Sequence, residues 1–424
     1  MENIKPYHKQ KKLLIIGGGF AGMNLAQEAL KSDAFQITLI DRNNYNYFPP
    51  LLYQVATSFL DPSGISYPFR KLFRNERVKF RMGEMIKVDT ANRIAYLTNA
   101  ELPYDELIFA TGARTNFFGN ENIRQNSLPM KTIDDALLMR NALLKTLEQA
   151  SICTDPEERR KLLTIVVAGG GPTGVEVSGM LAEMKKYILT KDYPEIKNSG
   201  GKIYIVDGGE ALLAPMSEKT HEETKKALIS LGVIVKLETR VADFKDGLVT
   251  LSTGETIEAQ TLIWAAGITA NTFEGISPEM RGPGQRMITD EHNKVIGLEN
   301  VYAIGDSCIM TSDPSYPHGH PQLAQVAIQQ GRNLARNLIA ANKEKALKPF
   351  IYFDKGDMAI VGRHNAVVDM FKHKVHLKGV PALFIWLFIH LISLVSYTNK
   401  IKTLYNWTIA YLSKDQSLRM IFRS

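Results

Sequence analysis

Short apolar runs rich in β-branched residues recur along the chain, and each is followed by a turn and then by a helical pattern. Residues 13–16 (LLII) lead into three glycines at 17–19, and residues 164–168 (TIVVA) lead into three more at 169–171. Runs of this length bounded by glycine are typical of buried parallel strands. Because helical patterns alternate with these strands, the sequence predicts an α/β fold.

The same order of elements occurs twice. Residues 107–115 (LIFATGART) and 262–270 (LIWAAGITA) resemble each other, and their glycines, Gly112 and Gly267, follow the first glycine of their module by 95 and 98 residues. Between them, residues 78–97 and 233–251 alternate apolar and polar positions, and we expect each to form a three-stranded meander inserted as the crossover of a parallel sheet. Two unrelated glycine-rich α/β domains are the alternative, which the repeated order of elements disfavours.

Each turn has the Gly-x-Gly-x-x-Gly spacing of a dinucleotide-binding motif. The first glycine allows a tight turn, the second lets the backbone approach a pyrophosphate, and the third lets the helix pack on the strand. The helix N-terminus directs backbone N–H groups at the phosphates. The glycines at this spacing are Gly17, Gly19 and Gly22 in the first module and Gly169, Gly171 and Gly174 in the second. Two such motifs predict two dinucleotides, between which electrons would pass.

An acid follows the second predicted strand of each module. Asp41 comes directly after the strand predicted at residues 36–40, and Asp207 comes directly after the one at residues 202–206. An acid there hydrogen-bonds a ribose hydroxyl, although a turn or helix cap would use the same residue type. No arginine follows Asp207 to receive a 2′-phosphate, so the sequence favours NAD(H) over NADP(H).

A late strand indicates how the modules are connected. Residues 300–308 (NVYAIGDSC) read as a strand ending in Gly-Asp, after the second module has closed. The second module is therefore predicted to be inserted into the first. We expect a first domain from residues 1–120 and 285–350, an inserted domain from 121–284, and a C-terminal region from 351–424.

This arrangement resembles the two-dinucleotide-fold flavoprotein oxidoreductases, in which the first module and the late Gly-Asp hold FAD and the inserted module holds NAD(P)H. Residues 47–57 (YFPPLLYQVAT) and 324–329 (AQVAIQ) resemble segments of the type II NADH dehydrogenases, and the basic apolar tail resembles their membrane anchor. The resemblance covers nearly the whole chain. It implies catalytic or quinone-site roles for Glu176, Gln325, Gln329 and Lys378, of which Lys378 rests on the loosest alignment. It implies dinucleotide contacts for Gly17, Gly18, Gly19, Phe20, Ala21, Gly22, Asp41, Arg42, Met85, Thr111, Gly112, Asp306, Ala324 and Gln325 (FAD) and Gly169, Gly171, Gly174, Asp207 and Gly267 (NADH).

Simpler interpretations exist for several of these residues. Gln325 and Gln329 stand four positions apart, so both could lie on a solvated helix face. Glu176 falls in the expected first turn of a helix, where the helix dipole alone favours an acid. Cys308 is expected to be a packing residue and Cys153 to lie in a polar loop. The histidines have no metal-ligand spacing, so no metal is predicted.

The net charge of +7 is concentrated in the C-terminal region. Residues 341–424 contain 13 Lys and Arg but only 5 Asp and Glu, together with Trp386 and Trp407. These residues flank the apolar run 382–395, which is shorter than the ~20 residues that a membrane span needs. The pattern favours an amphipathic helical region, residues 379–424, that lies on an anionic membrane surface; a helical hairpin that covers a soluble core is the alternative. Nucleic acid is not an expected partner.

The leading functional interpretation is therefore a non-pumping NADH:quinone oxidoreductase with bound FAD. Its expected place is the cytoplasmic face of the membrane as a peripheral or monotopic enzyme, with menaquinone or ubiquinone as acceptor and a homodimer as assembly. A disulfide reductase or a sulfide:quinone oxidoreductase would need cysteines near the flavin, and residues 41–61 contain none. An NADH-binding redox sensor or electron-carrier reductase remains the alternative from another functional class.

Overall fold

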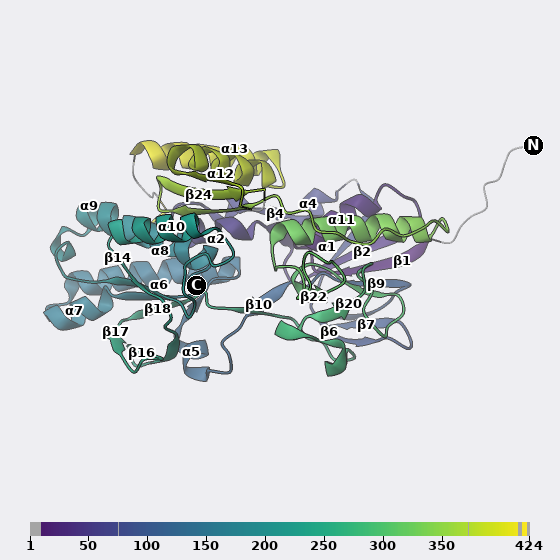
Figure 1. Cartoon of the computed structure of the whole chain (residues 1–424), viewed down its shortest axis with the longest axis horizontal. Coiled ribbons are helices and arrows are strands. Elements are labelled where there is room, and N and C mark those ends of the chain that lie inside the picture. The colour runs from purple at the N-terminus through teal and green to yellow at the C-terminus, as the bar shows by residue number, and fades with distance from the viewer. Residues whose placement is uncertain (1–9, 75, 372, 414–417, 422–424) are drawn as a thin grey trace, which may run out of the picture. The chain divides into compact units, whose positions relative to one another are not determined.

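The computed structural model describes residues 10–413 and 418–421, except 75 and 372. The chain divides into two compact units, each built from separate stretches of sequence (Figure 1). The first unit consists of residues 1–46, 67–114 and 268–354, and the second of residues 47–66, 115–267 and 355–424.

The first unit is built on a five-stranded parallel sheet. Its strands lie in the order β21 (Val301–Ala303), β9 (Glu106–Phe109), β1 (Lys11–Ile16), β2 (Phe35–Asp41) and β5 (Val78–Met82). Residues 13–16 of β1 are all buried, as expected for a strand covered on both faces. Helix α1 (Phe20–Ala29) follows β1 and packs against α11 (Ala324–Ala341), which returns from late in the sequence.

The crossover of the first unit differs from the prediction at its first strand. The meander consists of β6 (Met85–Asp89), β7 (Ile94–Leu97) and β8 (Ala100–Pro103), all antiparallel. The run that begins at Val78 instead pairs in parallel with β2. Alternation along residues 78–82 could not distinguish these two pairings, since either sheet buries one face of the strand.

The second unit repeats this plan. Its parallel sheet has the order β11 (Leu128–Pro129), β18 (Thr261–Trp264), β12 (Ile165–Ala168), β13 (Ile203–Val206) and β14 (Val233–Lys236). Here too the run that begins at Val233 joins the parallel sheet, and the meander is β15 (Val241–Lys245), β16 (Leu248–Leu251) and β17 (Thr256–Glu258). The helices of this module are α6 (Ile133–Ile152), α7 (Pro156–Leu162), α8 (Pro172–Met184) and α10 (Glu218–Ser230).

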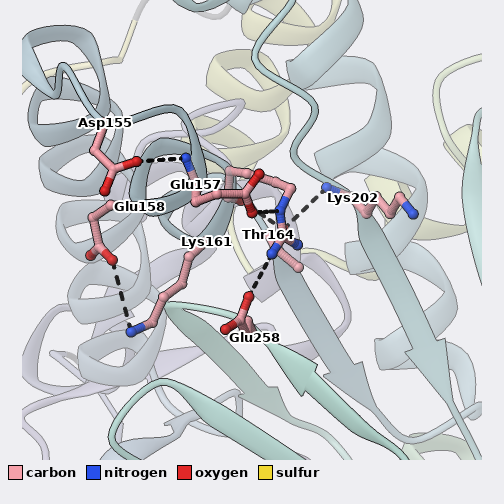
Figure 2. Close-up of polar contacts among 8 residues, drawn as sticks. Asp155, Glu157, Glu158, Lys161, Thr164, Lys202 and Glu258 are labelled. Carbon is pink, nitrogen blue, oxygen red and sulfur yellow. Dashed lines mark hydrogen bonds and ion pairs between the residues drawn. The ribbon is translucent and has the colours of Figure 1, made fainter.

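Polar contacts fix the approach to β12, the strand that carries the second glycine turn (Figure 2). Asp155 caps α7 by accepting a hydrogen bond from the backbone N–H of Glu157 at 2.9 Å. After α7, the Thr164 hydroxyl donates to the carbonyl of Arg160 at 2.8 Å and accepts from the backbone N–H of Lys202 at 3.4 Å. These bonds satisfy backbone groups at the helix end and align β12 with β13.

The C-terminal region belongs to the second unit. It forms an antiparallel sheet of β23 (Asp357–Val361), β24 (Asn365–Met370) and β25 (Val375–Lys378), followed by helices α12 (Gly379–Ser393) and α13 (Tyr397–Ser413) (Figure 1). Trp386 is fully buried and Trp407 is 3% exposed. This region therefore completes the hydrophobic core of the second unit, whereas the sequence suggested a separate region beginning at 351.

Shorter elements complete the described chain. The helical ones are η1 (Pro49–Leu51), α2 (Leu52–Ala56), α3 (Pro62–Ile65), α4 (Phe69–Leu72), α5 (Glu121–Asn126), the π-helix η2 (Lys185–Leu189), α9 (Thr190–Asp192), η3 (Pro194–Ile196), η4 (Pro278–Met280), η5 (Pro283–Gln285) and η6 (Gly305–Ser307). The strands are β3 (Tyr45–Tyr47), β4 (Ser66–Pro68), β10 (Ala113–Thr115), β19 (Ile268–Ala270), β20 (Met287–Thr289) and β22 (Cys308–Met310).

The predicted α/β class is confirmed, with two parallel-sheet modules of which one interrupts the other. The two units divide after residues 114, 267 and 354, and residues 47–66 join the second unit, which no local pattern indicated. Within the described residues, no helix has both the length and the apolar character needed to cross a membrane.

Candidate dinucleotide and proton-transfer sites

The first glycine turn lies at the carboxyl end of β1. Gly17 has a left-handed φ of +101°, and a Cβ atom there would lie 2.3 Å from the carbonyl oxygen of Ala110. Only glycine fits this position, for steric as well as conformational reasons. The next N–H, that of Gly18, donates to Asp41 Oδ2 at 2.7 Å. The turn and the acid at the end of β2 thus form one hydrogen-bonded unit.

The second turn reproduces this geometry at the end of β12. Gly169 has a φ of +112°, and a Cβ atom there would lie 2.4 Å from the carbonyl oxygen of Ala265. Gly170 N–H donates to Asp207 Oδ2 at 2.6 Å, and Gly209 N–H donates to Asp207 Oδ1 at 2.8 Å. The structure therefore brings each predicted acid to its own glycine turn.

Both turns leave room where a phosphate would lie. No atom comes within 4 Å of a Cβ built on Gly19 or on Gly171, which are the N-caps of α1 and α8. Neither helix has a side-chain cap or an acid in its first turn. Open helix N-termini without competing carboxylates are suited to a pyrophosphate, so the residues present fit a dinucleotide in each unit.

The acid of the first turn, Asp41, is held in a largely buried setting. Burial raises the pKa of Asp41 above its ordinary value, while hydrogen bonds from the backbone N–H groups of Asn43 and Gly18 act in the opposite direction. Arg42, the neighbour expected to contact the dinucleotide, is exposed. Met85 is buried in the core of the first unit, at 4% exposure.

The late Gly-Asp turn, η6, belongs to the first unit together with the ATG segment. The hydroxyls of Thr111 and Ser307 are 3.0 Å apart, and Ser307 also donates to the carbonyl of Gly112 at 3.4 Å. The backbone carbonyl of Asp306 accepts from Gln322 Nε2 at 3.1 Å. These contacts bring the predicted residues Thr111, Gly112 and Asp306 into one cluster.

Gln330 is a residue of this cluster that the sequence did not reveal. Its side chain is 1% exposed, and its Oε1 accepts from the backbone N–H of Gly305 at 2.7 Å. Gln330 is the residue directly after the AQVAIQ segment, which ends at Gln329. This position was the only signal in the sequence that could have indicated its role. In the second unit, Gly267 lies against the ring of Phe118, which would be 2.7 Å from a Cβ there.

Glu176 is buried on the second turn of α8, at 7% exposure. The helix begins at Pro172 and has no acid in its first turn, so the expectation of a dipole-stabilised first-turn acid is wrong. Burial raises the pKa of Glu176 well above its ordinary value, although a hydrogen bond from the backbone N–H of Ile360 acts in the opposite direction. Burial therefore favours the protonated form of this carboxyl group.

Aromatic groups from three other segments of the second unit surround this part of α8. The rings of Trp386 and His390 stack with centroids 3.8 Å apart, and burial lowers the pKa of His390 to about 4. Burial, with the nearby Glu176 carboxyl, raises the pKa of Tyr53 well above its ordinary value. Gln54 donates to the Tyr53 hydroxyl at 2.9 Å and accepts from Trp407 Nε1 at 2.8 Å. The sequence indicates the segment that holds Tyr53, but no pattern in it connects Tyr53 with Glu176.

The predicted quinone-site residues lie in different settings. Ala324 and Gln325 begin α11 in the first unit, and both are partly exposed. Gln329 donates to the carbonyl of Phe353 at 2.9 Å and accepts from its N–H at 3.1 Å, so both ends of its amide hold the backbone of one neighbour. Lys378 lies in the second unit and forms an exposed ion pair with Glu223 at 2.8 Å.

The two cysteines have no arrangement suited to redox exchange. Burial raises the pKa of the Cys308 thiol to about 11, so it is not a thiolate at neutral pH. Cys153 is the C-cap of α6. Among the residues that the structure describes, no group of His, Cys, Asp or Glu could hold a metal ion.

Comparisons with known proteins agree with this geometry. The family model "Pyridine nucleotide-disulphide oxidoreductase" matches residues 11–331, and the model "NDH2 C-terminal domain" matches residues 355–416. The type II NADH:quinone oxidoreductases Ndh and NdhA of Mycobacterium tuberculosis are 34% and 35% identical over 422 residues, which cover 96% and 95% of this chain and 89% and 87% of theirs. The structure of NDH2 from Plasmodium falciparum in complex with NADH has the same fold, with a TM-score of 0.88 and 23% identity over 98% of this chain and 100% of that one.

Proposed function

The chain belongs to the type II NADH:quinone oxidoreductases, and we propose that it oxidises NADH through bound FAD and passes two electrons to a membrane quinone. The observation that carries this proposal is the pair of glycine turns, each completed by its own acid, in a chain that also has the C-terminal region of this family. Two dinucleotide sites and a third, C-terminal region match a reaction with two nucleotides and one lipid-soluble acceptor.

The first unit would hold FAD and the second would hold NADH. Gly17 and Asp41 offer the pyrophosphate and ribose contacts of the first site, and Gly169 and Asp207 offer those of the second. Bound FAD supplies the capacity to accept a hydride and to release electrons to a quinone. The protein residues bind and orient both nucleotides.

Glu176 is our candidate for holding a proton needed in quinone reduction. Its carboxyl group is buried, burial favours its protonated form, and the backbone N–H of Ile360 donates a hydrogen bond to it. A neutral acid in such a setting can donate a proton without first losing a strong ion pair. The burial of Glu176 therefore supports an acid–base role more strongly than its sequence position did.

For the quinone head group we assign the direct polar contact to Gln325 and a positioning role to Gln329. Both ends of the Gln329 amide are engaged by Phe353, whose side chain is 67% exposed. Gln329 thus fixes the segment that carries this exposed aromatic ring. A direct contact with quinone would require Gln329 to exchange these hydrogen bonds.

The rival chemistries have less support. A disulfide reductase or a sulfide:quinone oxidoreductase needs reactive cysteines, whereas the Cys308 thiol is buried with a pKa of about 11. An electron-carrier reductase would not need the apolar face of α12 and α13 described below.

The direct test is anaerobic addition of NADH to the purified protein. Flavin absorbance should bleach at a stoichiometry of one NADH per FAD and return when a quinone analogue is added. Bleaching without recovery would leave an NADH-binding flavoprotein with a different acceptor. Absence of bleaching would contradict the whole assignment.

We propose membrane-surface binding through the outer faces of α12 and α13. The exposed side chains of α12 recur every four residues, at Val380, Phe384, Phe388 and Ile392, while Trp386 and His390 point into the core. On α13 the exposed apolar positions are Tyr397, Ile401, Leu404, Tyr405, Ile409 and Leu412. An apolar patch of this extent is typical of a protein or membrane interface.

Vesicle sedimentation would test this face. The double variant Phe384→Ser/Phe388→Ser should lose most of its binding to anionic vesicles and keep its FAD, because neither side chain is buried in the core. Ile152→Ser removes an even more exposed apolar side chain from α6 and serves as the control. Equal binding by both variants would contradict the proposal.

The enzyme would then work at the cytoplasmic face of the membrane, where NADH is available. A homodimer stays a prediction, which sedimentation velocity of the purified protein would test.

A further inference from the structure

We propose that Asp369, a residue of the C-terminal region, positions the loop that binds the adenosine end of NADH. The inference rests on the proposed function, because it assigns NADH to the second glycine turn. It concerns the Asp369 clamp, by which we mean the Asp369 carboxylate and its donors Ser217, Thr220 and His376. The clamp joins β24 to the N-terminus of α10 within the second unit.

The clamp has a fully buried carboxylate as its centre. Asp369 is 0% exposed; its Oδ2 accepts from the Ser217 backbone N–H at 2.8 Å and from the Thr220 hydroxyl at 2.9 Å. Its Oδ1 accepts from the Ser217 hydroxyl at 3.1 Å and lies 2.9 Å from His376 Nδ1. Hydrogen bonds to a carboxylate are among the strongest in proteins, so this is a firm attachment.

The charge state of Asp369 agrees with this geometry. Burial alone would raise the pKa of Asp369, but hydrogen bonds from the Ser217 backbone, His376, the Ser217 hydroxyl and Thr220 outweigh it and lower the pKa. Asp369 is therefore charged at neutral pH, and it also lies at the positive end of the α10 dipole.

The clamp fixes one end of the loop that follows Asp207. At its other end the loop begins with Asp207, which accepts from Gly170 N–H at 2.6 Å. In the middle, Leu213 N–H donates to the Gly170 carbonyl at 2.8 Å, which returns the loop to the glycine turn. Ser217, the N-cap of α10, ends the loop and is held by Asp369. The loop that carries the ribose acid is thus fixed at both ends and at its centre.

This arrangement makes NADH affinity depend on a region outside the nucleotide-binding module. Loss of the clamp should release the loop and weaken nucleotide binding, while the bound nucleotide still reaches the flavin in the same geometry. We therefore expect Asp369 to affect NADH half-saturation and not the limiting rate of flavin reduction.

The test uses the full-length holoenzyme with Asp369→Asn, Thr220→Val and Thr220→Ser. Asp369→Asn should raise the NADH half-saturation for flavin reduction, and the dissociation constant of NAD⁺ measured by calorimetry, by about five- to tenfold. Thr220→Val removes one donor at constant size and should give a smaller rise, whereas Thr220→Ser keeps the hydroxyl and should behave as wild type. If Asp369→Asn does not fold, the two Thr220 variants decide the question.

The matched control is Glu222→Gln, which breaks the exposed ion pair with Lys226 on the same helix without touching the clamp. It should leave NADH half-saturation, FAD content and quinone turnover unchanged. Lower thermal stability of Asp369→Asn with unchanged NAD⁺ affinity would overturn the inference and leave Asp369 a stabilising residue only. Calorimetry measures NAD⁺ binding without turnover. If the wild-type protein binds NAD⁺ but its flavin does not bleach with NADH, the proposed function is contradicted and the inference about Asp369 is not.

Discussion

Gly17 in the first unit and Gly169 in the second have nearly the same backbone conformation and the same close carbonyl, yet different segments cover the two turns. Asn46 donates to the Gly18 carbonyl at 2.8 Å, and Gly305 from the late Gly-Asp turn lies against Ala21 of α1. At the second turn, Leu213 of the loop that follows Asp207 donates to the Gly170 carbonyl at 2.8 Å. A turn supported by an additional segment from late in the sequence suits a cofactor that stays bound, whereas a turn supported by one loop suits a substrate that must leave.

The two helices that follow the turns differ at one further position. Asn24 and Glu176 each stand two residues after the third glycine of their motif. Asn24 donates to the Phe20 carbonyl at 2.8 Å and accepts from Arg332 at 3.0 Å, so its amide serves packing within the first unit. Glu176, at the same place in the second unit, is a buried acid whose pKa is raised by burial. One fold thus provides an inert position in one module and a titratable one in the other.

Matched glycine substitutions should give the largest difference between the two units in nucleotide binding. Gly17→Ala should abolish FAD retention, because its Cβ would overlap the Ala110 carbonyl and its φ of +101° is unfavourable for alanine. Gly169→Ala creates the same overlap with Ala265 but should retain FAD and lose NADH binding. Flavin absorbance and NAD⁺ calorimetry measure the two outcomes. Loss of FAD from Gly169→Ala would contradict the assignment of FAD to the first unit and NADH to the second.

The next largest effect is expected from Glu176→Gln. Glutamine resembles the protonated acid, so folding, FAD content and flavin reduction by NADH should persist. Steady-state quinone reduction should fall by roughly 10²- to 10⁴-fold, as for loss of a general acid–base group. Stopped-flow and steady-state assays on one preparation distinguish these steps. Unchanged turnover would leave Glu176 with the same inert role as Asn24.

Asp207→Ser should have an intermediate effect, confined to the second turn. The variant loses a charged acceptor for the ribose and a repulsive group against a 2′-phosphate. We expect kcat/KM for NADH to fall by about tenfold, in line with a lost hydrogen bond to a charged group, and discrimination against NADPH to relax. Comparable use of both nucleotides by wild type would refute the role of Asp207.

The smallest effect is expected from acid titration of His390. Its pKa is about 4 in the folded protein against an ordinary value of 6.5, because burial disfavours the charged ring. Between these values the unfolded chain binds a proton that the folded chain does not, so stability falls as pH drops from 6.5 to 4. The loss at pH 5.5 is roughly 1 kcal/mol. Thermal melts should therefore be less acid-sensitive for His390→Phe than for wild type; equal sensitivity would argue against the shift.

Local sequence patterns were sufficient to predict the features that depend on the geometry of neighbouring residues. Gly17, Gly169, Asp41 and Asp207 were predictable because turn, strand end and helix start are adjacent in sequence and have strict steric requirements. The repeat predicted two parallel-sheet modules, but it wrongly placed the strands that begin at Val78 and Val233 in the meanders. Even the insertion of one module into the other could be predicted, because the Gly-Asp strand returns so late.

The surroundings of Glu176 were not predictable in this way. Trp386 and Tyr53 reach this part of α8 from segments 210 and 123 residues away, and periodicity contains no information about such contacts. The buried face of the C-terminal helices was only the alternative interpretation, for a related reason. Its tryptophans were assigned to the membrane surface, a common location for tryptophan, but Trp386 and Trp407 fill the core instead.

The discontinuous second unit has a consequence for folding of the chain during its synthesis on the ribosome. Its parts are residues 47–66, 115–267 and 355–424, and buried Trp386 and Trp407 come from the last of them. At a synthesis rate of about 5–20 residues per second, roughly 10–40 seconds pass between the synthesis of α8 and that of α12. Throughout that interval the side of α8 that carries Glu176 lacks its cover. We therefore expect the incomplete chain to bind chaperones during synthesis.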